Sequence, residues 1–373
     1  MFTKHSINNS KTSQDGKITE LSSVLEQNFE RKINKARLKL ISMMILALCK
    51  IKTVNYNALS NVFDSCASAE SSLRRIQRFM ADFDLPMKLV SGFIFGILPE
   101  KKNLILVLDR TNWKFGSNNI NILMLGICYK NIAIPIMFKM LDKRGNSHTG
   151  ERIELIKQYI SWFGKDTIDC LLADREFIGE DWFDFLNKNN IKYYIRLRNN
   201  FKVFCFDKNE EKPVFWLFNK LKIGEFYHHP KIVKINGVLC YLSGIKNITK
   251  EGRIDFLIII SFNKPEKSLM YYQKRWQIET LFKAFKSSGF NIEDTHVTDQ
   301  KRLEKLFMIV MIALVWCYKI GDYLHENIKS IKIKKHQRKA FSVFKYGLNC
   351  INNILNNALN IIKINVLQFL SCT

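Results

Sequence analysis

Residues 103–109 read NLILVLD, six residues dominated by aliphatic side chains and then an aspartate. A short, continuous apolar run of this kind predicts a strand that is buried on both faces of a sheet. A second such run, DCLLA at residues 169–173, is followed by Asp174. Each of the two strands is therefore expected to end at an aspartate, Asp109 in the first case and Asp174 in the second.

The segments around these two runs alternate between strand and helix patterns. Further strands are expected at 120–129, 132–140, 192–198 and 254–262, and helices at 151–163, 181–188 and 303–323. From 201 to 253 the pattern becomes short and strand-rich, with turn signals at Asn236-Gly237 and Glu251-Gly252. The order predicts an α/β layered fold with a mixed sheet, interrupted by a β-rich insertion.

Residues 271–288 read YYQKRWQIETLFKAFKSS and predict one long helix. At roughly 100° per residue, spacings of three, four and seven return to the same helix face. That face carries a phenol, a carboxylate and three cations: Tyr272, Arg275, Glu279, Lys283 and Lys286. The opposite face is apolar and should meet a core: Ile278, Leu281, Phe282 and Phe285. The polar face is expected to be exposed, either as a metal-binding acid beside phosphate-binding bases or as a solvated face with helical ion pairs.

Three acids in this pattern, Asp109, Asp174 and Glu279, could form one catalytic site. The ends of strands in open α/β sheets are where ligands gather, so Asp109 and Asp174 would share one crevice if their strands are neighbours. Glu279, on a later helix, could complete the set. Three carboxylates can hold two Mg²⁺ ions for in-line displacement at phosphorus. The alternative for each aspartate is an ordinary turn residue or helix cap.

The charge of the chain favours a polyanionic partner. The 373 residues carry a formal net charge of +24, and the positive charge is dispersed along the chain. Nucleic acid is the first candidate, and the alternative is a compositional bias toward lysine. Nine cysteines without a CxxC pattern suggest reduced thiols. The polar start lacks a signal peptide, and the most apolar run, residues 306–318, is too short to span a bilayer. We therefore expect a soluble cytoplasmic protein without a membrane partner.

Basic segments occur within the first hundred residues and in the C-terminal tail. Residues 1–20 suggest a mobile polar start, and 21–98 suggest helices, among them 31–50 and 69–83. The second of these carries Arg74, Arg75 and Arg78, which fits either a DNA-reading unit or a bundle with a basic outer face. Residues 327–346 contain lysines and an arginine but no acid, so they predict a DNA-backbone contact or a solvated face.

The motifs resemble a known family. Asp109 in LVLDRTNW, Asp174 in LLADREF and the set Tyr272, Arg275, Glu279 and Lys286 resemble DDE transposases of bacterial insertion sequences, over roughly residues 100–320. The branch is the one named for its Y-R-E-K signature, the fourth insertion-sequence family. The resemblance implies an RNase H-like core with a β-rich insertion between Asp174 and Glu279. It also implies cleavage of the ends of an insertion sequence and joining of their 3′-OH ends to target DNA, by cut and paste.

The same resemblance implies a cofactor, partners and residue roles. Asp109, Asp174 and Glu279 would be catalytic and would hold Mg²⁺, with Mn²⁺ as a substitute. Tyr272 and Arg275 would contact phosphate and Lys286 would position the DNA end, while Arg175 and Lys283 are additional DNA contacts. The partners would be double-stranded DNA, as terminal repeats and target, and a second copy in a homodimeric synaptic complex. The location would be the bacterial cytoplasm, at the nucleoid.

A tryptophan bears on the route of cleavage. Some members cleave through a DNA hairpin and hold a flipped base against tryptophan, and Trp276 matches one position used there. A second tryptophan late in the insertion is expected in those enzymes, but residues 237–269 contain none, and Trp216 lies earlier. The alternative for either tryptophan is core packing.

The sequence thus predicts five regions and leaves two other functions open. The regions are a helical DNA-end-binding region (1–98), a first part of the catalytic core (99–200), the β-rich insertion (201–253), a second part of the core (254–323) and a basic C-terminal tail for dimerisation or DNA contact (324–373). The open alternatives are a catalytically silent DNA-binding copy and an RNase H-like nuclease without strand transfer. Isolated or paired histidines receive no metal role: His148, His228 and His229.

Overall fold

The computed structural model describes residues 5–29, 32–207, 209–356 and 365–370, which form two compact units. The sheet unit consists of residues 100–112 and 119–281. The helical unit consists of the remaining described residues, including the short stretch 113–118 and everything from Phe282 onward.

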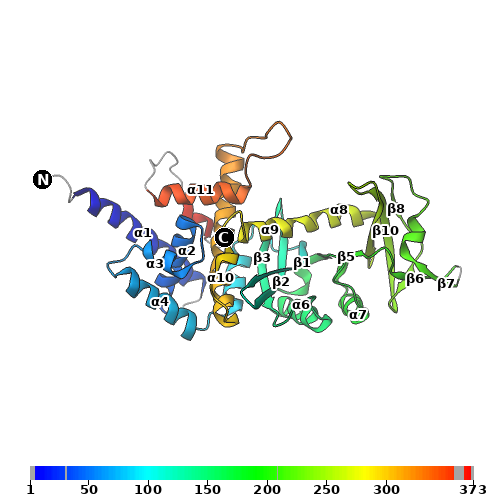
Figure 1. Cartoon of the computed structure of the whole chain (residues 1–373), viewed down its shortest axis with the longest axis horizontal. Coiled ribbons are helices and arrows are strands. Elements are labelled where there is room, and N and C mark those ends of the chain that lie inside the picture. Colours follow the sequence, from blue (N-terminus) through cyan, green and yellow to red (C-terminus); the bar gives the residue numbers. More distant parts are fainter. Residues whose placement is uncertain (1–4, 30–31, 208, 357–364, 371–373) are drawn as a thin grey trace. The chain divides into compact units, whose positions relative to one another are not determined.

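A mixed sheet organises the sheet unit, as expected from the sequence (Figure 1). Its strand order is β3-β2-β1-β4-β5-β11-β10-β9-β6-β7, and β8 pairs with β10. Strands β1, β4 and β5 are parallel, whereas β3 is antiparallel to β2 and β11 is antiparallel to both β5 and β10. The strands are β1 (Leu104–Phe115), β2 (Asn118–Tyr129), β3 (Ile132–Met140), β4 (Ile168–Ala173), β5 (Lys192–Leu197), β6 (Lys202–Cys205), β7 (Glu210–Pro213), β8 (Phe226–His228), β9 (Val233–Ile235), β10 (Val238–Ile248) and β11 (Ile254–Ser261).

Helices cover both faces of the parallel strands. Figure 1 shows α6 (Thr149–Phe163) and α7 (Glu180–Lys188) on one side and α8 (Ser268–Tyr272) on the other. Helix α7 turns Trp182, Phe183 and Leu186 fully inward. This double covering explains the apolar run of residues 170–173 in β4, which is fully buried, whereas Asp169 near the start of the strand is partly exposed.

Strand β1 is longer than the sequence suggested. The expected strand ended at Leu108, but the observed one continues to Phe115, so Asp109 lies inside it and not at its end. After Asp109 the burial alternates, with Thr111 buried and Asn112 exposed. An apolar-run criterion stops at Asp109 because only one face of the later part of the strand needs apolar residues.

The β-rich segment expected after residue 201 contains β6 to β10 and the short 3₁₀ turn η2 (Val214–Phe218). The predicted turn at Asn236-Gly237 joins β9 to β10 as an antiparallel hairpin. Both residues have positive φ, 46° and 79°, which is the backbone that a two-residue type I′ turn requires.

The helical unit begins earlier in the chain than predicted. Residues 1–20 were expected to be a mobile start, but α1 begins at His5 and buries Ile18, Leu21 and Leu25 against the unit, where α1 packs on α2. The expectation was therefore wrong from His5 onward, and residues 1–4 lie outside the described part. The helices are α1 (His5–Asn28), α2 (Lys35–Ile51), α3 (Tyr56–Asn61), α4 (Ala69–Asp82), α5 (Met87–Gly96), α10 (Gln300–Tyr323) and α11 (Val343–Leu355).

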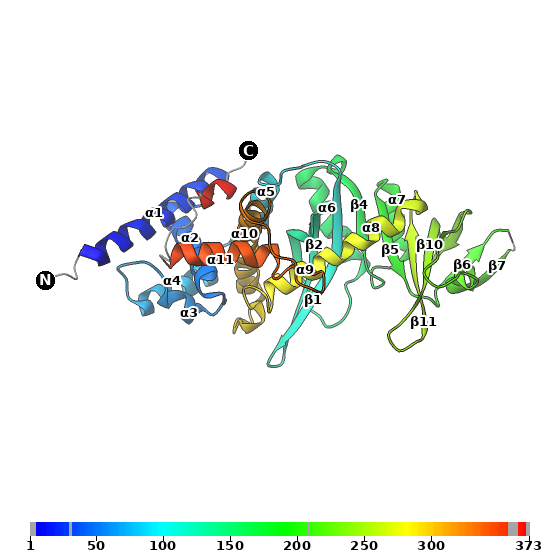
Figure 2. The same cartoon turned by 90° about the horizontal axis from the view of Figure 1, so that it is seen from above.

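Helix α10 is the expected buried helix of residues 303–323. The Asp299 side chain caps it by accepting a hydrogen bond from the Arg302 amide at 2.8 Å. Helix α11 packs on it (Figure 2), with Gly321 and Gly347 at the contact. A Cβ atom at Gly347 would collide with the Cys317 carbonyl oxygen, so the two backbones touch directly. No helix among the described residues has the length and apolar character needed to cross a membrane.

The close contact of α10 and α11 gives a stability prediction. Gly347→Ala should lower the free energy of unfolding by about 1–3 kcal/mol, because an added methyl group meets backbone that cannot turn away. Gly92→Ala on α5 is the matched control, since nothing lies near its Cβ position and alanine favours a helix. Urea unfolding of both variants measures the difference. Equal stability of the two variants would contradict the packing described for Gly347.

Candidate active site

The two aspartates are brought together by strand pairing. Strands β1 and β4 are parallel neighbours, with Leu108 opposite Ala173, so Asp109 and Asp174 are the next residues on the two strands. Each carboxylate accepts a hydrogen bond from the amide that follows it, at 2.7 Å from Arg110 and 2.8 Å from Arg175. The expectation that the two strands are neighbours is confirmed.

The sequence predicted one long helix over residues 271–288, here called the signature segment, but the structure divides this stretch into three parts. It consists of α8, the 3₁₀ turn η4 (Gln273–Trp276) and α9 (Gln277–Phe285), and η4 lies against β4. The tighter 3₁₀ geometry is common at junctions between helical segments.

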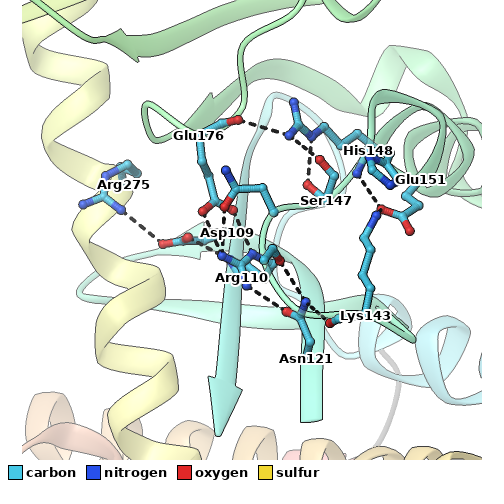
Figure 3. Close-up of polar contacts among 12 residues, drawn as sticks. Asp109, Arg110, Asn121, Lys143, Ser147, His148, Glu151, Glu176 and Arg275 are labelled. Atoms are coloured by element: carbon cyan, nitrogen blue, oxygen red, sulfur yellow. Dashed lines mark hydrogen bonds and ion pairs between the residues drawn. The ribbon is translucent and has the colours of Figure 1, made fainter. Parts of the chain in front are cut away.

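Side chains of this segment reach all three acids. The Tyr272 hydroxyl donates to Asp174 Oδ1 at 3.2 Å. The Arg275 guanidinium donates to Asp109 Oδ2 at 3.2 Å and to Glu279 Oε1 at 2.8 Å. Figure 3 shows the first of these Arg275 contacts, which crosses from the helical segment to β1. Residues that are far apart in the sequence thus converge on one site within the sheet unit.

These contacts correct the expected exposure of the polar face. Tyr272 is only 8% exposed and Arg275 only 7%, because both turn toward the carboxylates and away from water. The apolar face is largely as predicted, with Ile278, Leu281 and Phe285 buried, but Phe282 is only half-buried. An amphipathic pattern cannot distinguish solvent from a buried cluster of polar partners.

The other predicted DNA contacts are distributed over both units. Arg175 is exposed on the turn after β4, and Trp276 is 59% exposed, so core packing is the wrong interpretation for Trp276. Trp216 is equally exposed, and core packing is wrong there too. Lys283 and Lys286 belong to the helical unit, where Lys283 is exposed. There the Lys286 ammonium lies 2.7 Å from Glu293 Oε1 and over the ring of Trp113.

Burial and neighbouring charges set the proton affinity of Asp109. Burial raises the pKa of Asp109 to about 7, against the opposing effects of the Arg110 amide and the Arg275 guanidinium. The negative charges of Glu176 and Asp174 also contribute to this raised pKa. For Arg275, burial works to lower the pKa, but Tyr272 and the surrounding carboxylates outweigh it and raise the pKa. The site is therefore an anionic cluster with one buried arginine as its cation.

The site has the donor chemistry of a magnesium site. Carboxylate oxygens are the ligands that Mg²⁺ prefers, and a desolvated anion such as Asp109 favours a nearby cation. Nevertheless, no three acids, cysteines or histidines among the described residues are gathered at the spacing of metal ligands. The Arg275 guanidinium joins Asp109 and Glu279 instead.

Sequence reasoning missed a polar network behind the aspartates. Its central contact is an ion pair between Arg110 in LVLDRTNW and Glu176 in LLADREF. Their positions beside the aspartates were visible in the sequence, but their pairing depends on the parallel contact of β1 with β4.

Comparison with known proteins gives one family match. A family model described as a transposase DDE domain matches residues 100–316, which is more than half of the chain. No curated protein matches. Among solved structures, the cryo-EM structure of the piggyBac transposase synaptic complex with hairpin DNA is similar at 14% identity and a TM-score of 0.44, covering 95% of this chain and 81% of that chain.

The raised pKa of Asp109 predicts a pH-dependent stability. A carboxyl whose pKa is higher in the folded state stabilises the fold fully below its unfolded pKa near 4, and this contribution is lost as the pH rises through about 7. Asp109→Asn, which mimics the protonated form, should therefore stabilise the protein at pH 8 by on the order of 1–3 kcal/mol.

The measurement is urea unfolding in EDTA at pH 5 and pH 8. The gain from Asp109→Asn should be larger at pH 8. Asp184→Asn, at an aspartate on the outer side of α7, is the surface control. A gain that is the same at both pH values would show that Asp109 does not titrate in this range.

Proposed function

Because this chain belongs to the transposase DDE domain family, we propose that it is a cut-and-paste DNA transposase of the branch with the Y-R-E-K signature. In this proposal it cleaves the ends of an insertion sequence and joins their 3′-OH ends to target DNA. The core would be RNase H-like, and the strand order β3-β2-β1-β4-β5, with helices on both faces, supports that assignment.

One observation carries the proposal. Tyr272 and Arg275 of the signature segment contact Asp174, Asp109 and Glu279, so the three motifs meet at one site. In an ordinary surface helix, ion pairs form within the helix, and they would not involve two aspartates on the strands of the sheet. The convergence supports Asp109, Asp174 and Glu279 as the catalytic acids.

We assign the chemistry to these three carboxylates and their basic neighbours. When bound, Mg²⁺ or Mn²⁺ would activate the attacking water or 3′-hydroxyl and stabilise the leaving oxygen. Asp109, Asp174 and Glu279 would hold it, and Arg275 would release a carboxylate and contact DNA phosphate instead. Guanidinium suits both roles because it binds carboxylate and phosphate with the same planar geometry.

DNA contacts are proposed for both units. In the sheet unit they are Tyr272, Arg275, Trp276 and Arg175, and in the helical unit Lys283 and Lys286. The region of residues 1–98 would read the transposon ends, with α4 presenting exposed Arg74 and Arg78. Residues 324–373 would contribute to a homodimeric synaptic complex or to DNA contact. The net charge of +24 supports a large phosphate contact surface.

A catalytically silent DNA-binding copy is the second candidate, and one observation favours it. The Arg275 guanidinium forms ion pairs with both Asp109 and Glu279, and the described acids do not lie at the spacing of metal ligands. This candidate predicts specific binding to the element ends without cutting under any divalent ion.

The deciding experiment is cleavage of the flanking element end by the purified full-length chain with Mg²⁺ or Mn²⁺, against EDTA. Cuts should require metal and should fall by at least about 10³-fold in Asp109→Ala, Asp174→Ala and Glu279→Gln, because each removes a metal ligand. End binding should remain in all three variants. Binding without any cut by the wild-type chain would support the silent copy, and a variant that still cuts would remove that residue from the site.

Electrostatic binding predicts a steep dependence on salt. If several phosphates are neutralised, affinity for the end DNA should fall by about 10³-fold or more between 50 and 200 mM salt. A fluorescence anisotropy titration at several salt concentrations measures the slope. A flat response would contradict the assignment of the positive charge to phosphate contacts.

A further inference from the structure

The turn that carries Asp174 lacks the support of the sheet. Strand β4 ends at Ala173, and the next regular element, α7, begins at Glu180. Strand β1 continues to Phe115 beside β2, so Asp109 is held by its own strand. Asp174 instead precedes a turn whose internal backbone support is the hydrogen bond from the Phe177 amide to the Asp174 carbonyl, at 3.0 Å. Side chains must therefore fix the geometry of this turn.

An ion pair from β1 supplies one restraint on the turn. Arg110 Nε lies 3.1 Å from Glu176 Oε1, and Arg110 Nη2 lies 3.2 Å from Glu176 Oε2 (Figure 3). The side chain of Arg110 is 13% exposed and that of Glu176 is 21% exposed. Such a two-point contact fixes orientation as well as distance. The pair therefore connects Arg110, which follows Asp109, to Glu176, which lies two residues after Asp174.

A second arginine, from α6, holds the same turn. Arg152 of α6 is 3% exposed, and its Nη2 donates to the Glu176 carbonyl oxygen at 3.1 Å and to the Ser147 carbonyl oxygen at 2.6 Å. Its guanidinium also lies over the ring of Phe177, at 5.0 Å from the ring centre. Residue 176 is thus held by its side chain from β1 and by its backbone from α6.

Arg110 is itself fixed in place. Its Nη1 donates to Asn121 Oδ1 at 3.0 Å, and Asn121, 2% exposed on β2, donates to the carbonyl oxygens of Lys143 and Gly145 at 3.0 Å each. A third contact runs from Arg110 Nη2 to Asn146 Oδ1 at 3.2 Å. Because Arg110 binds Glu176, Asn121 and Asn146, it holds the turn after Asp174 at a fixed place relative to β1 and β2.

We propose that Arg110 and Glu176 are positioning residues that set the separation and orientation of Asp109 and Asp174. The inference rests on the proposed function, because it assigns these two acids to one metal site. An ion pair with a purely structural role would affect stability but not metal affinity.

The test uses the full chain with Glu176→Gln and Arg110→Lys, which keep size or charge but lose the two-point pair. Glu151→Gln is the matched control. Its carboxylate pairs with Lys143 at 2.7 Å and is 22% exposed, but it does not contact the turn. Electron paramagnetic resonance measures Mn²⁺ affinity. Cleavage of end DNA is assayed over a range of Mg²⁺ concentrations. End binding and melting temperature are measured separately.

Loss of ligand positioning should weaken Mn²⁺ binding by about 10-fold or more and raise the half-saturating Mg²⁺ concentration in parallel. End binding should stay within about twofold of the wild-type value, and Glu151→Gln should match wild type in Mn²⁺ affinity and in the Mg²⁺ dependence of cleavage. The double variant should be no worse than either single variant, since both remove the same contact.

Three results would overturn the proposal, and the first two would leave the proposed function standing. If wild type cuts, Glu279→Gln does not, and Glu176→Gln and Arg110→Lys retain wild-type Mn²⁺ affinity, the positioning role is wrong while the transposase assignment stands. A lower melting temperature with unchanged metal affinity would equally rule out positioning, because it shows that the ion pair only stabilises the fold. If wild type neither binds Mn²⁺ nor cuts, the proposed function fails and the positioning role fails with it.

Discussion

Parallel pairing of β1 with β4 is the constraint on which the site depends. With Leu108 opposite Ala173, the two following aspartates must lie side by side. A slip of one residue would direct one carboxylate to the opposite face of the sheet, since side chains alternate along a strand. The pair Arg110–Glu176 and the contact of η4 with β4 both depend on this register. The sheet therefore determines the positions of the polar groups, and the later segments add to them.

Bringing acids together in a partly buried site is unfavourable unless a cation is close. Arg275 supplies that cation for Asp109 and Glu279, and the Tyr272 hydroxyl supplies a hydrogen bond to Asp174. Arginine suits this position better than lysine because its planar group can donate to two carboxylates at once and keeps its charge when buried. Trp276, next in the chain, stays exposed, so the 3₁₀ turn η4 directs neighbouring side chains to a buried and to an exposed environment.

Much of this architecture could be predicted because its signals are local. Apolar runs predicted β4 and the first part of β1, and the length of the run at 306–318 predicted the buried helix α10. Features that depend on distant partners were missed. Tyr272 and Arg275 were expected to be exposed because their carboxylate partners lie about a hundred or more residues away. The start of α1 was missed because its polar composition hides the few apolar residues that pack, and the role of Glu176 became visible only with the strand register.

The double contact of Arg275 has a consequence for how the protein is made. An acidic site that lacks its own counter-ion must capture a metal while the chain folds, as small zinc domains do. Here the neutralising charge is part of the chain, four residues before Glu279. The carboxylates Asp109 and Glu279 therefore have a counter-ion within the sheet unit itself. Under the proposed function, newly synthesised molecules would reach their final shape first and would bind ions later, when the guanidinium exchanges a carboxylate for a phosphate.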